Sequence, residues 1–487
     1  MPINSFLYPG PTNSNPYVVD NSCRFEDGDS AYMHKTCSSD GNSKTFTISF
    51  WQKLGTAFDA DRAVISGGAD SNNYLVVRNT SSQTLQILET ASGSDHTNLI
   101  TSRLFRDPSA WYNIVIAVDT TQGTASNRVK LYVNGTQETS FSTATYPGED
   151  DDLQFNNNTA HAIGRRQPQA NIYMDGYLAE VVFIDGLQLA ASSFGEFDAD
   201  SPTIWKPKNL NPISGLKGTN GFYLDFEDSA NLGNDVWGGT DLTEVNLAAA
   251  DQATDTPTNS FCTLNPLSHR TQSGTVTACT FAEGNNKATH GHGSNVTIAV
   301  GTMAVSSGKW YFEAKVDDAG DDANIGVISA SADLSGQQGV SGHPSIYYGS
   351  NGKKCYNVIA SNDGDSFGDT YTDDDIISVA LDLDNNVIWF AKNGTWQDSG
   401  DPTSGATATG AAFSGTGTSD GFPTTSSFYL PVTVGYNSFI ASTNFGGCPA
   451  FSISSGNADA NGYGNFEYAP PSGFYALCSK NLAEFGG

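Results

Sequence analysis

The chain has 487 residues, and its 52 acidic and 23 basic side chains give it a formal net charge of −29. The length predicts about two to four domains. The negative charge argues against nucleic acid and anionic lipid as partners, because phosphates and anionic headgroups would be repelled.

Composition favours short strands joined by turns. Hydrophobic residues make up 38% of the chain, which is enough for packed cores, and its 51 glycines are typical of many tight turns. The seven cysteines are scattered without a zinc-binding spacing, so we expect free buried thiols.

Targeting signals are not apparent. Residues 1–5 lack the basic and apolar regions of a signal peptide, and no stretch approaches the ~20 apolar residues of a membrane span. We therefore expect synthesis in a cytoplasm without a signal peptide, and no membrane insertion.

Strand signals recur along the chain. Apolar and polar residues alternate at 46–51 and 128–133, and the second run ends in Asn134-Gly135, a strong hairpin signal. Residues 387–392 likewise end in Asn393-Gly394. Long helical periodicities are missing, so the predicted fold class is all-β.

The strand signals are densest in two regions, which we interpret as two β-sandwich (jelly-roll-type) domains in tandem, at 1–205 and 295–450. Residues 206–294 form a predicted β-rich connector that packs on its neighbours, since Phe222, Tyr223 and Trp237 are too apolar for a free linker. The aromatic tail at 451–487 is expected to dock against the fold or a partner subunit.

The N-terminal region carries four blocks in a recognisable order, at residues 46–51, 111–119, 128–135 and 177–186. In order and spacing they resemble the laminin G-like, concanavalin A-like jelly-roll family. The resemblance implies a fold that mostly binds glycans or proteins. Some relatives hydrolyse polysaccharides with a Glu-x-Asp-x-x-Glu pattern, which is missing here. Glu180 and Asp185 are five positions apart, so a regular strand would direct them to opposite faces.

The C-terminal region carries further blocks, at residues 307–316, 325–327, 347–349, 375–384, 387–394, 429–435 and 444–446. They resemble the SPRY domain family, with Ser378 where that family usually has Gly. The resemblance implies a non-catalytic sandwich that binds proteins or small ligands through loops at one end. Those loops would include residues 317–322, 337–343, 364–374 and 403–425.

Candidate ligand-binding residues follow from these loops. Tyr347, Tyr348, Tyr371 and Trp396 lie near them, and exposed aromatic rings can stack on sugar faces. Asp369, in the loop at 364–374, completes the predicted ligand-binding set.

A metal site is a second hypothesis. Asp150, Asp151 and Asp152 could hold Ca²⁺, which prefers several oxygen ligands, and relatives of the N-terminal fold often bind calcium at the sandwich rim. The alternative is a solvated acidic loop. His290-Gly291-His292 could also bind a metal, although a third ligand is missing nearby in the sequence. No cofactor other than calcium is indicated.

Marine bacteriophage proteins often pair these two domain types across a connector similar to residues 218–226, 231–235, 254–259 and 263–267. This resemblance implies a protein on the virion surface, in contact with other virion proteins and displayed as a homotrimer, as in a tail fibre.

The expected function is non-enzymatic recognition of a host cell-surface polysaccharide or protein. The first alternative is a capsid-decorating or head-fibre protein without a specific receptor, which the lack of a shaft favours. The second is a polysaccharide depolymerase, although no nucleotide-binding, serine-hydrolase or zinc-protease motif is present.

Overall fold

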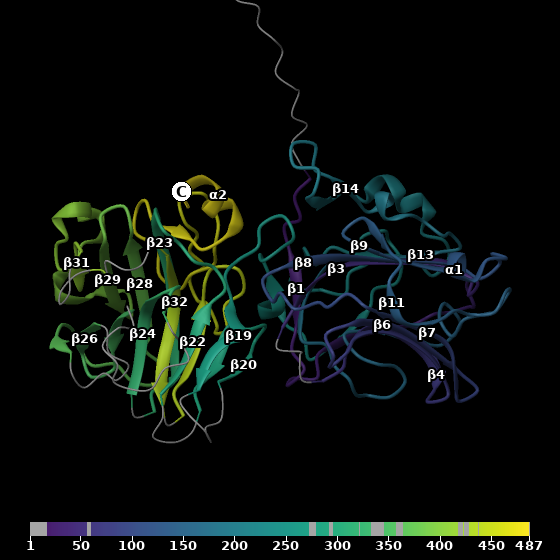
Figure 1. Cartoon of the computed structure of the whole chain (residues 1–487), viewed down its shortest axis with the longest axis horizontal. Helices are drawn as coiled ribbons and strands as arrows, with labels where there is room; N and C mark the ends of the chain where they lie inside the picture. Colours follow the sequence, from purple (N-terminus) through teal and green to yellow (C-terminus); the bar gives the residue numbers. More distant parts are fainter. Residues whose placement is uncertain are drawn as a thin grey trace, which may run out of the picture.

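The structure is a computed structural model that describes residues 17–55, 60–271, 279–291, 296–320, 322–332, 345–356, 364–416, 422, 428–436 and 438–486. Figure 1 shows two bodies side by side, each a stack of two β-sheets. The predicted fold class, two β-sandwiches in tandem, is confirmed. None of the helices in the described part of the chain has the length and apolar character needed to cross a bilayer.

The N-terminal sandwich consists of two eight-stranded sheets. The first has the order β10-β9-β8-β3-β13-β1-β18, with β16 paired to β13. Its strands are β1 (Ser22–Phe25), β3 (Thr45–Leu54), β8 (Trp111–Asp119), β9 (Val129–Val133), β10 (Thr136–Glu138), β13 (Gly176–Asp185), β16 (Phe222–Leu224) and β18 (Gln252–Ala253).

The second sheet has the order β11-β7-β6-β5-β4-β12-β2-β17. Its strands are β2 (Tyr32–Thr36), β4 (Arg62–Asp70), β5 (Asn73–Asn79), β6 (Leu85–Ala91), β7 (Ser94–Thr101), β11 (Phe141–Thr145), β12 (Ala160–Ile163) and β17 (Thr243–Val245). Phe46, Ile48 and Phe50 of β3 are fully buried in the core between the sheets. The other face of the first sheet is covered in part by a hairpin of β14 (Gly195–Phe197) and β15 (Trp205–Pro207), so central strands are buried on both faces.

The C-terminal sandwich has a seven-stranded sheet of order β19-β22-β32-β24-β25-β26-β27. Its strands are β19 (Leu264–Thr271), β22 (Thr297–Gly301), β24 (Asp322–Ser329), β25 (Ser345–Gly349), β26 (Lys353–Tyr356), β27 (Asp365–Ser366) and β32 (Tyr429–Tyr436).

The facing sheet has the order β20-β21-β33-β23-β28-β29-β30, with β31 paired to β29 and β34 paired to β23. Its strands are β20 (Thr280–Ala282), β21 (Lys287–Thr289), β23 (Lys309–Asp318), β28 (Ile376–Asp382), β29 (Val387–Lys392), β30 (Thr395–Trp396), β31 (Phe413–Ser414), β33 (Ile440–Asn444) and β34 (Tyr475–Ala476).

Both predicted Asn-Gly hairpins are confirmed. Asn134 and Gly135 join β9 to β10 with φ of 46° and 76°, and Asn393 and Gly394 join β29 to β30 with φ of 48° and 76°. Positive φ at both central residues is the requirement of a type I′ turn, which Asn and Gly meet with the least strain.

The described residues between 206 and 294 do not form a body of their own. Strands β16, β17 and β18 are hydrogen-bonded into the N-terminal sandwich, whereas β19, β20 and β21 are hydrogen-bonded into the C-terminal one. Phe222, Tyr223 and Phe226 are at most 5% exposed, so this segment contributes to the N-terminal core.

The tail at 451–487 lies along the C-terminal sandwich and ends in α2 (Ser479–Phe485). The fully buried carboxylate of Glu313 accepts hydrogen bonds from the backbone N–H groups of Glu467, at 2.9 Å, and Tyr468, at 2.8 Å. Strand β34 pairs in parallel with β23, so the tail is fixed by backbone as well as side-chain contacts.

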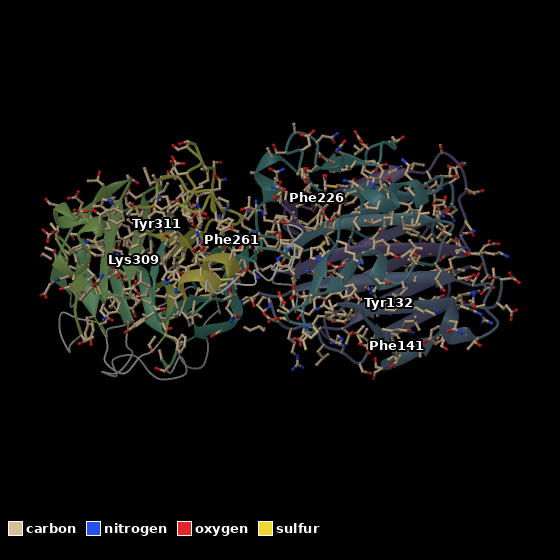
Figure 2. All side chains as sticks on the ribbon, turned by 90° about the horizontal axis from the view of Figure 1, so that it is seen from above. Tyr132, Phe141, Phe226, Phe261, Lys309 and Tyr311 are labelled. Carbon is tan, nitrogen blue, oxygen red and sulfur yellow. The ribbon has the colours of Figure 1, made fainter. Side chains whose placement is uncertain are left out.

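A polar junction joins the sandwiches. Lys53 of β3 and Asp255 are each 1% exposed, and their charged atoms lie 2.6 Å apart. Lys53 also donates to the backbone oxygen of Phe261, at 3.0 Å, and Figure 2 shows Phe261 where the two bodies meet. The hydroxyl of Tyr177 donates to the backbone oxygen of Gly284 at 3.0 Å. The hydrogen bonds from Lys53 and Tyr177 to Phe261 and Gly284 thus connect the two bodies directly.

All seven cysteines are buried, as predicted.

Candidate functional site

Three of the predicted ligand-binding aromatic residues are buried. Tyr347, Tyr348 and Tyr371 are 1%, 0% and 3% exposed, so the prediction that their rings stand exposed to a ligand is wrong. Tyr347 and Tyr348 belong to β25, which has a strand on each side and is buried throughout. The hydroxyl of Tyr371 donates to the backbone oxygens of Ala323 and Tyr348, both at 2.8 Å, which holds its ring inside the core.

Trp396 and Asp369, the other two predicted residues, line one open concavity of about 470 Å³. We call it the loop concavity, and its lining residues are Ser366, Phe367, Gly368, Asp369, Thr395, Trp396, Gln397, Asp398 and Ser399. Asp369 is exposed, whereas Trp396 is partly buried and packs against an aromatic cluster that contains Trp389 and Phe474.

The topology explains why these two segments meet. Strand β27 ends one sheet of the C-terminal sandwich and β30 ends the other, so the residues beside them lie at the same edge of the stack. This edge lies next to β26 and β29 and faces away from the N-terminal sandwich (Figure 1). The opposite edge, with β19 and β20, lies next to the N-terminal sandwich. The loop concavity is therefore open to a large partner.

Gln397 ties the two walls of the loop concavity together. It is 5% exposed, and its side-chain oxygen accepts hydrogen bonds from the backbone N–H of Asp369, at 2.8 Å, and from the hydroxyl of Tyr348, at 3.3 Å. Its amide nitrogen donates to the backbone oxygen of Thr395 at 2.9 Å. The hydroxyl of Tyr348 also donates to the backbone oxygen of Asp369. Tyr348 thus supports the site from below, although it does not line it.

The backbone of one wall is strained. Asp398 and Ser399 have φ of 51° and 57°, in the left-handed region that non-glycine residues seldom occupy. Such a conformation costs on the order of 1–3 kcal/mol for each residue, and strain of this kind is concentrated at binding and catalytic sites.

The electrostatics of the loop concavity are negative. Asp369 and Asp398 are both exposed, and in the part of the chain that the structure describes no hydrogen bond or ion pair reaches either carboxylate. Among the lining residues that the structure describes, there is no lysine or arginine. Burial, followed by the charge of Asp369, raises the pKa of Tyr348, so its hydroxyl stays protonated and can act as a donor.

The predicted calcium residues have separate partners. Asp150 lies 3.6 Å from the ammonium of Lys44, Asp151 accepts a hydrogen bond from the backbone N–H of Gly148 at 2.5 Å, and Asp152 accepts one from the hydroxyl of Ser43 at 3.1 Å. The three carboxylates therefore do not form a preassembled set of ligands, and the prediction that they share one ion site is not supported.

A second concavity, of about 610 Å³, lies at the rim of the N-terminal sandwich. Its polar lining includes Asp152 and Asp185. The carboxylate of Asp185 accepts from the backbone N–H of Asn42 at 2.9 Å and from the side chain of Asn156 at 2.6 Å, and it also accepts from two further backbone N–H groups. The carboxylate of Asp185 thus holds the surrounding loops together, and few of its lone pairs are left to accept a hydrogen bond from a ligand.

Another acidic group was not expected from the sequence. Glu26, Asp27 and Asp175 each place a carboxylate oxygen within 4.8 Å of the others. Glu26 accepts from the backbone N–H of Glu283 at 2.6 Å, and Asp27 lies 3.0 Å from Arg62. These contacts give the group a structural role beside the junction. The fold brings Asp175 next to Glu26 and Asp27, which are distant from it in the sequence, so no local sequence pattern could have predicted the group.

Of the candidate histidine motif, the structure describes His290, which lies in the core. His290 is 1% exposed, and its ring nitrogens lie 2.9 Å from the hydroxyl of Thr297 and 3.1 Å from that of Thr433. Burial lowers its pKa to about 4, so it is neutral near pH 7. His292, residues 337–343 and most of 417–425 lie outside the described residues.

Comparison with known proteins identifies both sandwiches. Residues 27–190 match the family model of the concanavalin A-like lectin/glucanases superfamily, and residues 309–424 match that of the SPRY domain. The chain is similar to Ran-binding protein 10 of Danio rerio, with 32% identity over 117 residues. That match covers 23% of this chain and only 19% of the relative.

The chain is also similar to parts of solved structures. The SPRY domain of human HERC1 has 18% sequence identity and a TM-score of 0.26, and the match covers 34% of this chain and 92% of that one. A putative carbohydrate binding protein from Bacteroides ovatus has 15% identity and a TM-score of 0.32, covering 47% of this chain and 59% of that one. By the two family models, the chain contains a concanavalin A-like and a SPRY domain in tandem.

Proposed function

We propose that this chain is a non-enzymatic recognition protein on the surface of a bacteriophage-type virus particle, where it binds a polysaccharide or protein of the host cell surface through the loop concavity. The observation that carries the proposal is the loop concavity itself. It combines a partly exposed indole with polar side chains on walls that Gln397 fixes in advance. Sites of this kind bind with little ordering cost, because their groups are already held in place.

The acidic residues of the N-terminal sandwich support binding rather than hydrolysis. Burial raises the pKa of Glu180 to about 8, and its carboxyl group accepts hydrogen bonds from Tyr223, at 2.9 Å, and Tyr17, at 3.1 Å. The Asp185 carboxylate is occupied by N–H donors. A retaining glycosidase needs two carboxyl groups about 5 Å apart beside its substrate, with one ionised. Glu180 and Asp185 each serve other contacts.

The junction between the sandwiches supports a display role. Because Lys53 and Tyr177 of the N-terminal sandwich donate hydrogen bonds to the backbone oxygens of Phe261 and Gly284, the loop concavity is presented at a fixed orientation to the N-terminal sandwich. Many copies on one particle, as in the homotrimer that the phage resemblance implies, would convert weak single contacts into firm attachment.

Adsorption to intact bacterial cells tests the proposal. The purified full-length protein is expected to adsorb to some strains of a diverse panel, and to compete with virus particles for those strains. If it adsorbs to no strain even when it is multivalently coupled to beads, the recognition function is wrong. Release of reducing ends from a capsular polysaccharide would instead indicate a depolymerase.

A further inference from the structure

The loop concavity has an aromatic surface suited to a cation. Trp396 is partly exposed, and it is held in place by the aromatic cluster beneath it. The face of an indole ring carries negative electrostatic potential, so it attracts an ammonium or guanidinium group placed over it. Phe367 also lines the loop concavity and packs against Tyr348, with ring centroids 5.5 Å apart.

The carboxylates of the loop concavity lack the partners that neighbouring carboxylates have. Asp375 lies 3.1 Å from the ammonium of Lys392, and Asp401 caps a turn by accepting from the backbone N–H of Thr403 at 2.9 Å. Asp369 and Asp398 border the loop concavity without such contacts in the described part of the chain. The chain has 23 basic side chains for 52 acidic ones, so these two charges must be balanced from outside or stay solvated.

A neutral ligand fits this site less well than a cationic one. A sugar hydroxyl can donate to a carboxylate but leaves its charge uncompensated, and covering an uncompensated charge costs free energy. A guanidinium group offers several N–H donors, matches carboxylate geometry and stacks on aromatic rings. Lysine can supply the charge but not the planar donors.

We therefore propose that the loop concavity binds an arginine side chain, or less tightly a lysine side chain, presented by a protein on the host surface. Asp369 and Asp398 pair with the cation, and Trp396 lies against its flat face. The inference rests on the proposed function and deepens it, because it selects a basic protein segment over a neutral polysaccharide as the partner.

The test uses the full-length protein and short uncharged peptides whose central residue is arginine, lysine or citrulline. Citrulline has nearly the shape of arginine but no charge. Calorimetry is expected to show binding in the order arginine, lysine, citrulline, with citrulline about tenfold or more weaker than arginine, since it loses both the ion pairs and the cation–π contact. Affinity for the arginine peptide is expected to fall as salt rises.

Isosteric variants locate the effect. Asp369→Asn and Asp398→Asn are each expected to weaken the arginine peptide roughly two- to fivefold, the range of an exposed ion pair. Asparagine also tolerates the left-handed φ of residue 398, so the loop should keep its shape. Asp200→Asn is the matched control, because Asp200 is an exposed aspartate of the N-terminal sandwich and its loss changes the net charge equally.

Equal affinity for arginine and citrulline peptides, or equal effects of all three variants, would overturn the inference. The peptide measurement needs no host, so it decides this inference even if the protein adsorbs to no cell. If the protein adsorbs to cells, and a neutral oligosaccharide but not the arginine peptide competes, the recognition function stands and the cationic ligand is wrong.

Discussion

The backbone N–H of Asp369 donates a hydrogen bond of 2.8 Å to the side-chain oxygen of Gln397. This contact joins the segment that follows β27 to the segment that follows β30. Strands β27 and β30 are the edge strands of the two different sheets of the C-terminal sandwich. One glutamine thus sets the width of the loop concavity.

Replacing Gln397 with alanine is expected to reduce both ligand affinity and stability. The change removes the acceptor for Asp369 and Tyr348 and leaves the buried Tyr348 hydroxyl with fewer partners. We expect the free energy of unfolding to fall by about 1–3 kcal/mol, measured by chemical denaturation. Gln86→Ala is the control, since Gln86 is also 5% exposed and hydrogen-bonded but lies in the N-terminal sandwich. If both variants weakened ligand binding equally, Gln397 would have no special role.

Removing the buried charge at the junction is expected to destabilise the whole chain. In the part of the chain that the structure describes, Lys53→Met leaves the carboxylate of Asp255, 1% exposed, with Trp111 as its side-chain donor, at 3.0 Å. Breaking such a pair costs about 3–5 kcal/mol. Thermal and denaturant unfolding measure this loss. Adding Asp255→Asn to the variant should restore part of it, and a loss below about 1 kcal/mol would show that the pair is solvated in solution.

Stability is expected to fall as pH rises from 6.5 to 8. Burial raises the pKa of Glu180 from 4.5 to about 8, and burial together with Asp175 raises that of Glu26. In this window the folded chain keeps protons that the unfolded chain has lost, so each group lowers the free energy of unfolding by up to about 1.4 kcal/mol per pH unit. Glu180→Gln should remove part of this slope, whereas Glu196→Gln, at an exposed site, should not.

Histidines act in the opposite direction at lower pH. Burial lowers the pKa values of His161 and His290 from 6.5 to about 4. The unfolded chain therefore binds more protons between pH 6.5 and 4, and stability is lost as the pH falls through that range. Between about pH 4.5 and 6.5 this loss is offset by the opposite effect of Glu180 and Glu26, so the four groups together predict maximal stability at about pH 5.5. A stability that still rises between pH 7 and 8 would contradict the account.

Calcium is expected to leave the melting temperature unchanged. Asp150, Asp151 and Asp152 each have a different partner, so an ion would have to break existing contacts to gather them. Differential scanning calorimetry with added calcium, and with a chelator, measures this. A rise in melting temperature that grows with calcium concentration would show a binding site in the folded chain.

The sequence predicted the fold better than the site. Alternation of apolar residues and the turns at Asn134-Gly135 and Asn393-Gly394 are local signals, and the hairpins form where they indicate. Side-chain exposure was predicted less well. Strand β25, with Tyr347 and Tyr348, is buried throughout, and its own residues do not indicate which other segments of the chain pack over it.

Two features of the site lay beyond sequence reasoning. Gln397 matters because its side chain reaches Asp369, which follows a strand of the opposite sheet, and that contact depends on tertiary packing. The strained φ values of Asp398 and Ser399 are likewise imposed by the surrounding loop, since neither residue type requires them. Trp396 and Asp369 could be singled out because Asp369 lies in a binding loop of a resembling family and Trp396 lies near such loops, and both line the loop concavity.

The most direct measurement compares adsorption of wild-type protein and the Trp396→Ala variant to a bacterial strain that the wild type binds. Loss of a central aromatic residue should weaken adsorption at least about tenfold. Phe197→Ala, which removes an aromatic side chain 45% exposed on the N-terminal sandwich, should leave adsorption unchanged. If Trp396→Ala adsorbs as well as the wild type while Phe197→Ala does not, recognition lies on the N-terminal sandwich and the central claim is contradicted.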